Sequence, residues 1–372
     1  MPNPYDPQTP ARPEYFGGRE QVLQVVQERI RLARDSKRGG GVLIYGHRGV
    51  GKTSLLKKIT SIAERKSESP TNALVFYRRL GRTTTDTELY ALLNEELREQ
   101  ITQRRSLIET VRAAAKAVES IQAFEIGIDL QKNAAERTPY QLWKQSIRTL
   151  RNVDYVLVAI DDADFLSIEA IGELKTIVED TQDTPVLLVV SGGIKFEEKL
   201  VDEYSPIARI FSGASFNVGK FELKETTEVL RKPLADERTT WQDDAITELH
   251  KLTMGYPFLV QCLAQATYIE HEALSKDFVR DAVPASLRIG RSWLDHEIPG
   301  ASDEDVQSFV KISGIGKDVL QSVEMSRAGV QSPYIGRLVR LGVLKKISRG
   351  RYQLIKSPMI ATYEALKRGL FS

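Results

Sequence analysis

The stretch Gly46-His47-Arg48-Gly49-Val50-Gly51-Lys52-Thr53 decides the fold of this chain. It follows the apolar run Val42–Tyr45 and precedes a helix-like stretch from Ser54 to Ile59. A strand, a glycine-rich loop and a helix form a phosphate-binding loop, because backbone N–H groups and the helix dipole point at phosphate oxygens. We therefore expect the following residues to bind a nucleotide, with Lys52 on the β- and γ-phosphates and Thr53 on Mg²⁺: Gly46, His47, Arg48, Gly49, Val50, Gly51, Lys52, Thr53 and Ser54. The alternative is a structural glycine-rich turn.

Composition limits the class of protein. The chain has 372 residues, 41% hydrophobic and 27% charged, which predicts a globular protein of two or three domains. We find neither a secretory signal nor an apolar run long enough to cross a membrane, so we expect a cytoplasmic protein without a membrane partner. The single cysteine, Cys262, excludes an intrachain disulfide or a zinc cluster and is expected in the core. A net charge of +2 gives the chain as a whole no general affinity for polyanions.

The sequence pattern predicts four parts. Residues 1–14 contain five prolines and are expected to be extended. We expect this arm to lie on the nucleotide domain, although a disordered leader is the alternative. Residues 15–222 are expected to form a P-loop domain, residues 223–290 a helical lid, and residues 291–372 a C-terminal winged helix.

In the P-loop domain, strands alternate with helices. Expected strands cover residues 42–45, 73–77, 153–160, 185–190 and 216–221, with helices at 20–34 and 86–120 among them. Continuous apolar strands are typical of parallel sheets that are buried on both faces, so we predict a doubly wound α/β domain. An insertion within residues 110–137, with a possible strand or hairpin at 124–130, receives no predicted role.

After residue 222 the pattern is helical, with helices near 225–234, from 243, and after Gly255-Tyr256-Pro257. Residues 284–301 contain prolines and are expected to be a linker. A helix capped by Ser332-Pro333 and two strands, 343–347 and 352–355, around a basic turn then predict a winged helix.

The second chemical element is an acidic pair. Asp161 and Asp162 follow the buried strand that ends at Ile160. A carboxylate at this position needs a positive partner such as Mg²⁺, so we expect Asp161 on the metal side and Asp162 to orient the attacking water. The alternative is that these acidic residues only cap the next helix, a role that Asp164 could also have.

These motifs together resemble the AAA+ and STAND-type P-loop ATPases, and among them the archaeal ATPases and origin-recognition-like proteins with a C-terminal winged helix. The resemblance rests on the P-loop, the acidic pair, Phe16-Gly17-Gly18-Arg19-Glu20, Ser191-Gly192 and Gly255-Tyr256-Pro257. It covers nearly the whole chain and implies an ATPase that uses ATP and Mg²⁺.

The resemblance also implies roles for single residues. Tyr15, Phe16 and Gly17, with Tyr256 and Pro257, would enclose the adenine, and Ser191 would sense the γ-phosphate. Arg209 would be an arginine finger for a neighbouring subunit in a homo-oligomer, or else a surface or salt-bridging residue.

Two departures from the family pattern favour a slow switch over a fast motor. Asp162 stands where the family often has the longer Glu. No Lys or Arg occurs from Tyr256 to Ser275, so the lid lacks an arginine sensor. Both point toward the STAND and archaeal-ATPase branch.

The C-terminal segment predicts a partner. No Asp or Glu occurs from Ser326 to Tyr363, while cations are frequent. A basic helix and wing are typical of duplex DNA binding, for which we expect these residues: Tyr334, Arg337, Arg340, Lys345, Lys346, Arg349 and Arg351. The alternative is a nucleotide-dependent signalling switch whose winged helix contacts protein partners. A small-molecule kinase does not explain the lid and winged helix.

Overall fold

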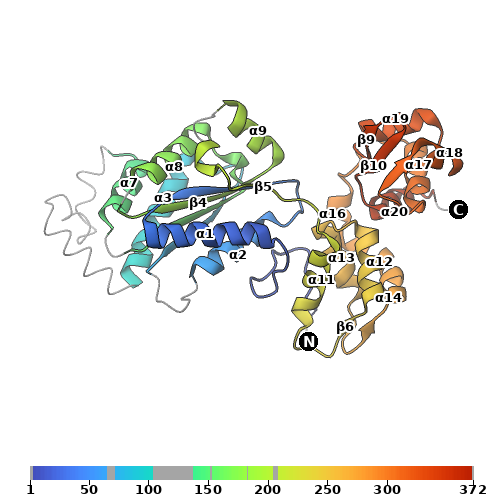
Figure 1. The fold of residues 1–372 in the computed structure, drawn as a ribbon, viewed down its shortest axis with the longest axis horizontal. Helices are drawn as coiled ribbons and strands as arrows, with labels where there is room; N and C mark the ends of the chain where they lie inside the picture. The colour runs from blue at the N-terminus through green and yellow to red at the C-terminus, as the bar shows by residue number, and fades with distance from the viewer. Residues whose placement is uncertain are drawn as a thin grey trace. The chain divides into compact units, whose positions relative to one another are not determined.

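The computed structural model describes residues 3–64, 72–103, 137–150, 153–181, 183–203 and 208–370. It forms two compact units, which are treated separately below (Figure 1). The P-loop unit comprises Arg19–Val218, and the C-terminal unit comprises Met1–Gly18 together with Gly219–Ser372. The four-part division expected from the sequence stays a prediction.

A five-stranded parallel sheet, in the order β2-β3-β4-β1-β5, forms the centre of the P-loop unit. The predicted α/β fold is confirmed. The strands are β1 (Gly40–Tyr45), β2 (Leu74–Arg79), β3 (Val156–Asp161), β4 (Val186–Gly192) and β5 (Ser215–Asn217).

Helices cover both faces of this sheet. Alternate residues of the strands face opposite sides, and Leu74, Val158 and Leu188 share a core with α3, α7 and α8. Figure 1 shows α1 and α2 on the opposite side from α7 and α8. The helices of this unit are α1 (Glu20–Ser36), α2 (Lys52–Glu64), α3 (Asp86–Gln103), α7 (Pro139–Thr149), α8 (Ile168–Asp180) and α9 (Ile194–Glu203), with the 3-10 turns η2 (Ala163–Phe165) and η3 (Arg209–Phe211).

The N-terminal arm belongs to the C-terminal unit. The buried Tyr5 hydroxyl donates to Leu230 O and accepts from Trp241 Nε1, and the Asn3 amide donates to Gln265 O. The arm is extended as expected, but the expectation that it lies on the nucleotide domain was wrong. Trp241 and Leu230, which are far from Tyr5 in the sequence, hold the arm against the C-terminal unit.

The region that was expected to form the lid is built mainly from helices, and it shares one hydrophobic core with the C-terminal end of the chain. Its elements are α11 (Leu223–Arg231), η4 (Lys232–Leu234), β6 (Thr240–Trp241), α12 (Asp243–Thr253), α13 (Pro257–Thr267), β7 (Ala273–Leu274), α14 (Lys276–Asp281), α15 (Val283–Ile289) and α16 (Arg291–Leu294). The linker expected at 284–301 was therefore wrong over its first half. Pro284 lies in the first turn of α15, where a missing N–H costs no helical hydrogen bond.

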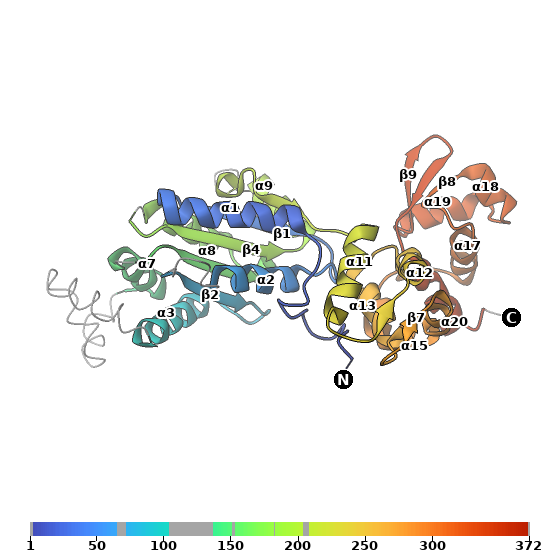
Figure 2. The same cartoon turned by 60° about the horizontal axis from the view of Figure 1, so that its bottom comes forward.

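The winged helix is confirmed at the C-terminal end. It consists of α17 (Asp303–Gly314), β8 (Val319–Gln321), α18 (Ser322–Arg327), α19 (Ser332–Arg340), β9 (Leu344–Ser348), β10 (Arg351–Leu354) and α20 (Pro358–Lys367). The sheet order is β8-β10-β9, with β10 antiparallel to both neighbours. Figure 2 shows the β9–β10 hairpin projecting beside α19.

Several smaller expectations can be compared with the structure. Thr85 and Glu88 form a capping box at the start of α3, since each side chain accepts a hydrogen bond from the other's backbone N–H. Cys262 is buried as expected, and burial raises the pKa of its thiol to about 12.

The insertion at 110–137 lies outside the described residues except for its last residue, Arg137. Among the described helices, none is sufficiently long and apolar to cross a bilayer.

Candidate nucleotide site and winged-helix surface

The carboxyl ends of four parallel strands meet at one edge of the sheet, and this register assembles the site. Tyr45 pairs with Gly192 across β1 and β4, and Arg79 pairs with Asp161 across β2 and β3. The Gly46 N–H donates to Gly192 O, which joins the start of the P-loop to the end of β4. Ligands of open parallel sheets bind at this edge.

The P-loop backbone needs its glycines. Gly49 and Gly51 have φ angles of 83° and 90°, a region that side chains other than glycine rarely adopt. A Cβ atom on Gly46 would lie 2.2 Å from Val218 O. The Arg19 guanidinium donates to Val50 O and supports the loop from the start of α1.

Lys52 lies across this loop. Its ammonium donates to Gly46 O at 2.9 Å and His47 O at 3.1 Å. Burial lowers the pKa of Lys52, and the carboxylates of Asp162, Asp164 and Asp161 oppose that change. The loop carbonyls therefore hold the ammonium in the P-loop, and its predicted contact with the β- and γ-phosphates stays a prediction.

Asp161 is fully enclosed, with no exposed surface. Its Oδ2 accepts from the Thr53 hydroxyl at 2.7 Å and from the Tyr77 hydroxyl at 3.1 Å. Its Oδ1 accepts a short hydrogen bond from the Ser191 hydroxyl. The structure thus brings together Thr53, Asp161 and Ser191, which the sequence had placed at one site.

The two carboxylates that follow have different partners. Asp162 has a left-handed backbone, with φ at 57°, and its Oδ2 lies 2.8 Å from Arg79 Nε. Asp164 accepts from the Gly193 N–H at 2.8 and 3.0 Å and so fastens η2 to the end of β4. The next helix, α8, is capped by Ser167, so the idea that Asp164 caps it was wrong.

The oxygen donors at this edge fit Mg²⁺. The Thr53 hydroxyl gives its hydrogen to Asp161, which leaves its lone pairs for a cation. Hard oxygen ligands of this kind, few in number, suit Mg²⁺, which takes its other ligands from water and phosphate. Across the part of the chain that the structure describes, no cluster of three or more His, Cys, Asp or Glu side chains could hold a metal.

The residues expected around the adenine lie in the C-terminal unit. Phe16 is buried and its carbonyl accepts from Lys232, while a Cβ on Gly17 would lie 3.0 Å from Val229 N in α11. Tyr256 packs against Trp293 with ring centroids 4.9 Å apart, and Pro257 begins α13. Packing within this unit accounts for these residues, and their role toward adenine stays a prediction, as does that of the half-buried Tyr15.

Arg209 is exposed at the start of η3 in the P-loop unit. The preceding residues 204–207 lie outside the described part of the chain. An exposed guanidinium can reach a second molecule, so the position is compatible with the predicted finger.

On the winged helix, the predicted cations fall into two groups. Arg340 on α19 and four residues of the hairpin are exposed: Lys345, Lys346, Arg349 and Arg351. We call these five residues the basic surface. Tyr334 is only half exposed.

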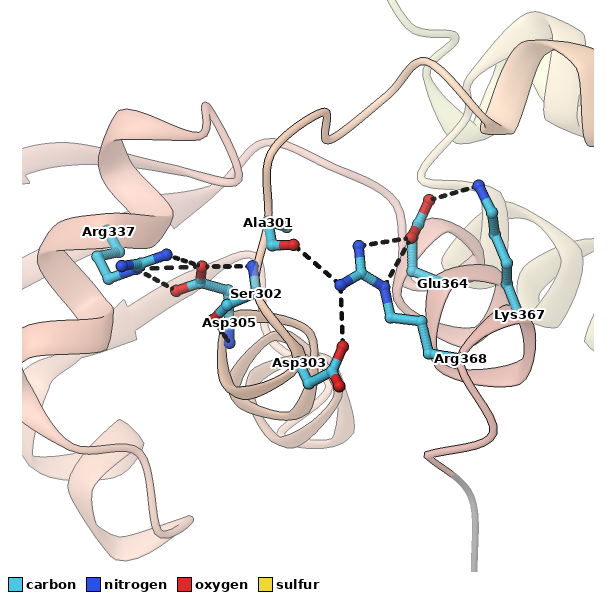
Figure 3. A network of polar contacts seen from close by, with 8 residues as sticks. All are labelled: Ala301, Ser302, Asp303, Asp305, Arg337, Glu364, Lys367 and Arg368. Atoms are coloured by element: carbon cyan, nitrogen blue, oxygen red, sulfur yellow. Dashed lines mark hydrogen bonds and ion pairs between the residues drawn. The ribbon is translucent and has the colours of Figure 1, made fainter.

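Arg337 differs from this group because it belongs to an ion pair. Figure 3 shows its guanidinium turned toward Asp305 near the start of α17. Arg337 Nε lies 2.8 Å from Oδ1, and the terminal nitrogen lies 2.6 Å from Oδ2 of the fully buried Asp305. Burial alone would raise the pKa of Asp305, but hydrogen bonds from Arg337 and Ser302 outweigh it and lower that pKa. The structure therefore gives Arg337 a structural partner in place of a free charge.

Sequence reasoning missed Tyr77 and Arg79. Both lie at the end of β2 and contact the acidic pair. A possible signal was available, because polar residues that follow an apolar parallel strand lie at the ligand-binding edge. The sequence alone did not show that β2 is the neighbour of β3.

The comparisons with known proteins agree with this geometry. The AAA ATPase domain family matches residues 15–190. No curated protein matches the chain. Among solved structures, the Aeropyrum pernix ORC2 protein in ADPNP-ADP complexes has a TM-score of 0.57 at 13% identity, covering 95% of each chain. Cdc6p from Pyrobaculum aerophilum has a TM-score of 0.50 at 12% identity, covering 94% of this chain and 93% of the other.

At such low identities the structural likeness shows the fold. The family match adds the nucleotide domain itself, with the P-loop and the acidic pair inside its bounds. Residues 15–190 therefore match the AAA ATPase domain family, and the fold of the ORC2 protein extends over 95% of this chain.

Proposed function

We propose that this protein binds Mg²⁺–ATP, hydrolyses it slowly, and uses its nucleotide state to control binding of the winged helix to duplex DNA. The observation that carries the nucleotide part is the hydrogen bond between Thr53 and Asp161, which joins the P-loop to the carboxylate of β3. The similar Aeropyrum pernix ORC2 protein was solved with ADPNP and ADP, which supports the choice of an adenine nucleotide.

The chain's own residues take the following roles in this proposal. Lys52 exchanges the carbonyls of Gly46 and His47 for phosphate oxygens. Thr53 and Asp161 hold Mg²⁺, which would supply positive charge against the developing charge of the phosphates. Asp162 orients the attacking water. The ion pair with Arg79 restrains this carboxylate, which agrees with a slow switch.

The last residue in the nucleotide part of the proposal is Arg209, which would act between two copies of the chain. Arg209 is exposed, and we propose that it reaches the γ-phosphate site of a second copy, where a guanidinium stabilises transition-state charge. Replacing Arg209 by Ala would then slow turnover only under conditions in which the particle mass shows an oligomer.

Lys52→Ala and Asp162→Asn test the nucleotide part. We expect Lys52→Ala to lose binding of a fluorescent ATP analogue, and Asp162→Asn to bind it without turnover. Lys57→Ala, on the same helix α2, is the matched control and should behave like the parent protein. Parent-level hydrolysis by either site variant would refute the site.

The DNA part rests on charge and exposure. The basic surface lies on α19 and the hairpin, in a segment without Asp or Glu from Ser326 to Tyr363. Such a helix and wing can contact a groove and its phosphates, and each phosphate contact makes affinity fall with salt.

Anisotropy with a labelled duplex across a salt series tests this surface. We expect Arg349→Ala/Arg351→Ala to weaken binding and flatten the salt slope by about one for each lost phosphate contact. Arg288→Ala removes an exposed charge from α15 and serves as control. Turnover stimulated by a protein partner, with no binding of DNA, would favour the signalling switch instead.

A further inference from the structure

The hydrogen bonds around Asp161 contain more donors than a metal-side carboxylate alone requires. Three hydroxyl groups from three different elements donate to it: Thr53 of α2, Tyr77 of β2 and Ser191 of β4. A carboxylate with no exposed surface needs such compensation, because burial without partners costs several kcal/mol. One of the donors, Thr53, also belongs to the P-loop.

The position of Tyr77 follows from the sheet register. It pairs with Ala159, two residues before the pair of Arg79 and Asp161. Side chains two residues apart on a strand share a face, so a tyrosine at this position reaches along the strand to the carboxylate. A tyrosine phenol carries its proton at neutral pH, so Tyr77 is the donor in its hydrogen bond to Asp161.

Ser191 is also committed to this carboxylate. A hydroxyl has a single hydrogen, and Ser191 gives it to Oδ1 of Asp161. Ser191 is fully buried between β3 and β1 in the sheet. While this bond is present, Ser191 cannot donate to a γ-phosphate, which was the role that the family resemblance implied.

We propose that Tyr77 and Ser191 are positioning residues that fix the orientation of the Asp161 carboxylate and thereby set the affinity of the site for Mg²⁺. This inference rests on the proposed function. Ser191 holds Oδ1, and Tyr77 shares Oδ2 with Thr53, beside which the cation would bind. Partners that orient a metal-side carboxylate typically change metal affinity by about 10- to 100-fold when they are removed.

The test uses the full chain with Tyr77→Phe and Ser191→Ala. The measurement is binding of a fluorescent ATP analogue at increasing Mg²⁺, which does not depend on turnover. We expect the half-saturating Mg²⁺ concentration to rise about tenfold in each variant. At saturating Mg²⁺, the amount of bound nucleotide should return to that of the parent protein.

Tyr155→Phe is the matched control. Tyr155 is a buried tyrosine next to β3 whose hydroxyl donates to Ala63 O, away from Asp161. The Tyr155→Phe variant loses one hydroxyl and one hydrogen bond, so it shows what such a loss does to the fold when Asp161 keeps its partners. Its Mg²⁺ midpoint should equal that of the parent.

The outcomes separate the two claims. An unchanged Mg²⁺ midpoint in Tyr77→Phe and Ser191→Ala, in a parent that does bind Mg²⁺–nucleotide, overturns the positioning role and leaves the proposed function intact. A midpoint that shifts equally in Tyr155→Phe overturns it too, because the effect would then be general. A parent that shows no Mg²⁺-dependent nucleotide binding refutes the proposed function itself.

Discussion

Arg79 Nε lies 2.8 Å from Oδ2 of Asp162, and the same nitrogen lies 4.0 Å from Oδ2 of Asp161. One guanidinium from the end of β2 therefore faces both carboxylates of the acidic pair. The Arg79 side chain is 60% exposed, so water screens this ion pair and the guanidinium can move away at small cost. The pair restrains Asp162 without locking it.

We expect Arg79→Ala to raise the rate of ATP turnover. Release of Asp162 lets the carboxylate turn toward the attacking water, and an exposed ion pair limits the gain to about fivefold. Steady-state phosphate release measures this. Arg82→Ala, an exposed charge shortly after β2, is the control. Slower turnover in Arg79→Ala would mean that this arginine assists the reaction.

Arg337 and Arg340 should separate stability from DNA binding. In Arg337→Ala the buried Asp305 loses its charged partner, so we expect the melting temperature of the C-terminal unit to fall by about 5 °C. Arg340 is exposed, so Arg340→Ala should leave the melting temperature unchanged and weaken DNA binding. Thermal melts and anisotropy on the same samples measure both quantities. The reverse pattern would show that Arg337 is the DNA contact.

A feature of the fold or the site could be predicted when neighbouring residues in the sequence determine it. The P-loop and Asp161 follow from a short motif and an apolar strand, and the wing follows from two short strands around a basic turn. All three are properties of neighbouring residues. The roles of Tyr77 and Arg79 required the strand order, because only the pairing of β2 with β3 brings them to the acidic pair.

The wrong expectations have the same origin. Tyr5 is held by Trp241 and Leu230, more than two hundred residues away, so its partner could not be derived from the arm itself. Arg337 was counted as a DNA contact because its helix is basic, and its pairing with Asp305 of α17 depends on the packing of two helices. Pro284 indicated a linker, although a proline also fits the first turn of a helix.

Replacing Gly336 by Ala should raise the stability of the C-terminal unit and weaken DNA binding. It lies exposed in the middle of α19, and a Cβ atom there would meet no atom within 4 Å. Gly336→Ala should therefore stabilise the C-terminal unit by about 0.4–1 kcal/mol. If α19 approaches DNA with the face that carries Gly336 and Arg340, the added methyl group should weaken binding. A variant that melts later and binds DNA as tightly as the parent would show that another face is used.

His250 should make the stability of the C-terminal unit depend on pH. Burial lowers the pKa of its imidazole, Asp318 opposes that change, and Lys220 reinforces it. Nδ1 of His250 lies 2.8 Å from the Thr226 hydroxyl, which links α12 to α11. Because the folded chain binds this proton less readily than the unfolded chain, the free energy of unfolding should fall as the pH drops below about 6.5.

Denaturant unfolding between about pH 5 and pH 8, followed by tryptophan fluorescence, measures this dependence. Trp241 and Trp293 report from the same unit as His250. His250→Gln keeps a polar partner for Thr226 and cannot titrate, so its stability should stay level over the pH range in which the parent protein weakens. His296→Gln, a histidine elsewhere in that unit, should retain the slope of the parent. If His250→Gln retained that slope as well, the pH dependence would come from a group other than His250.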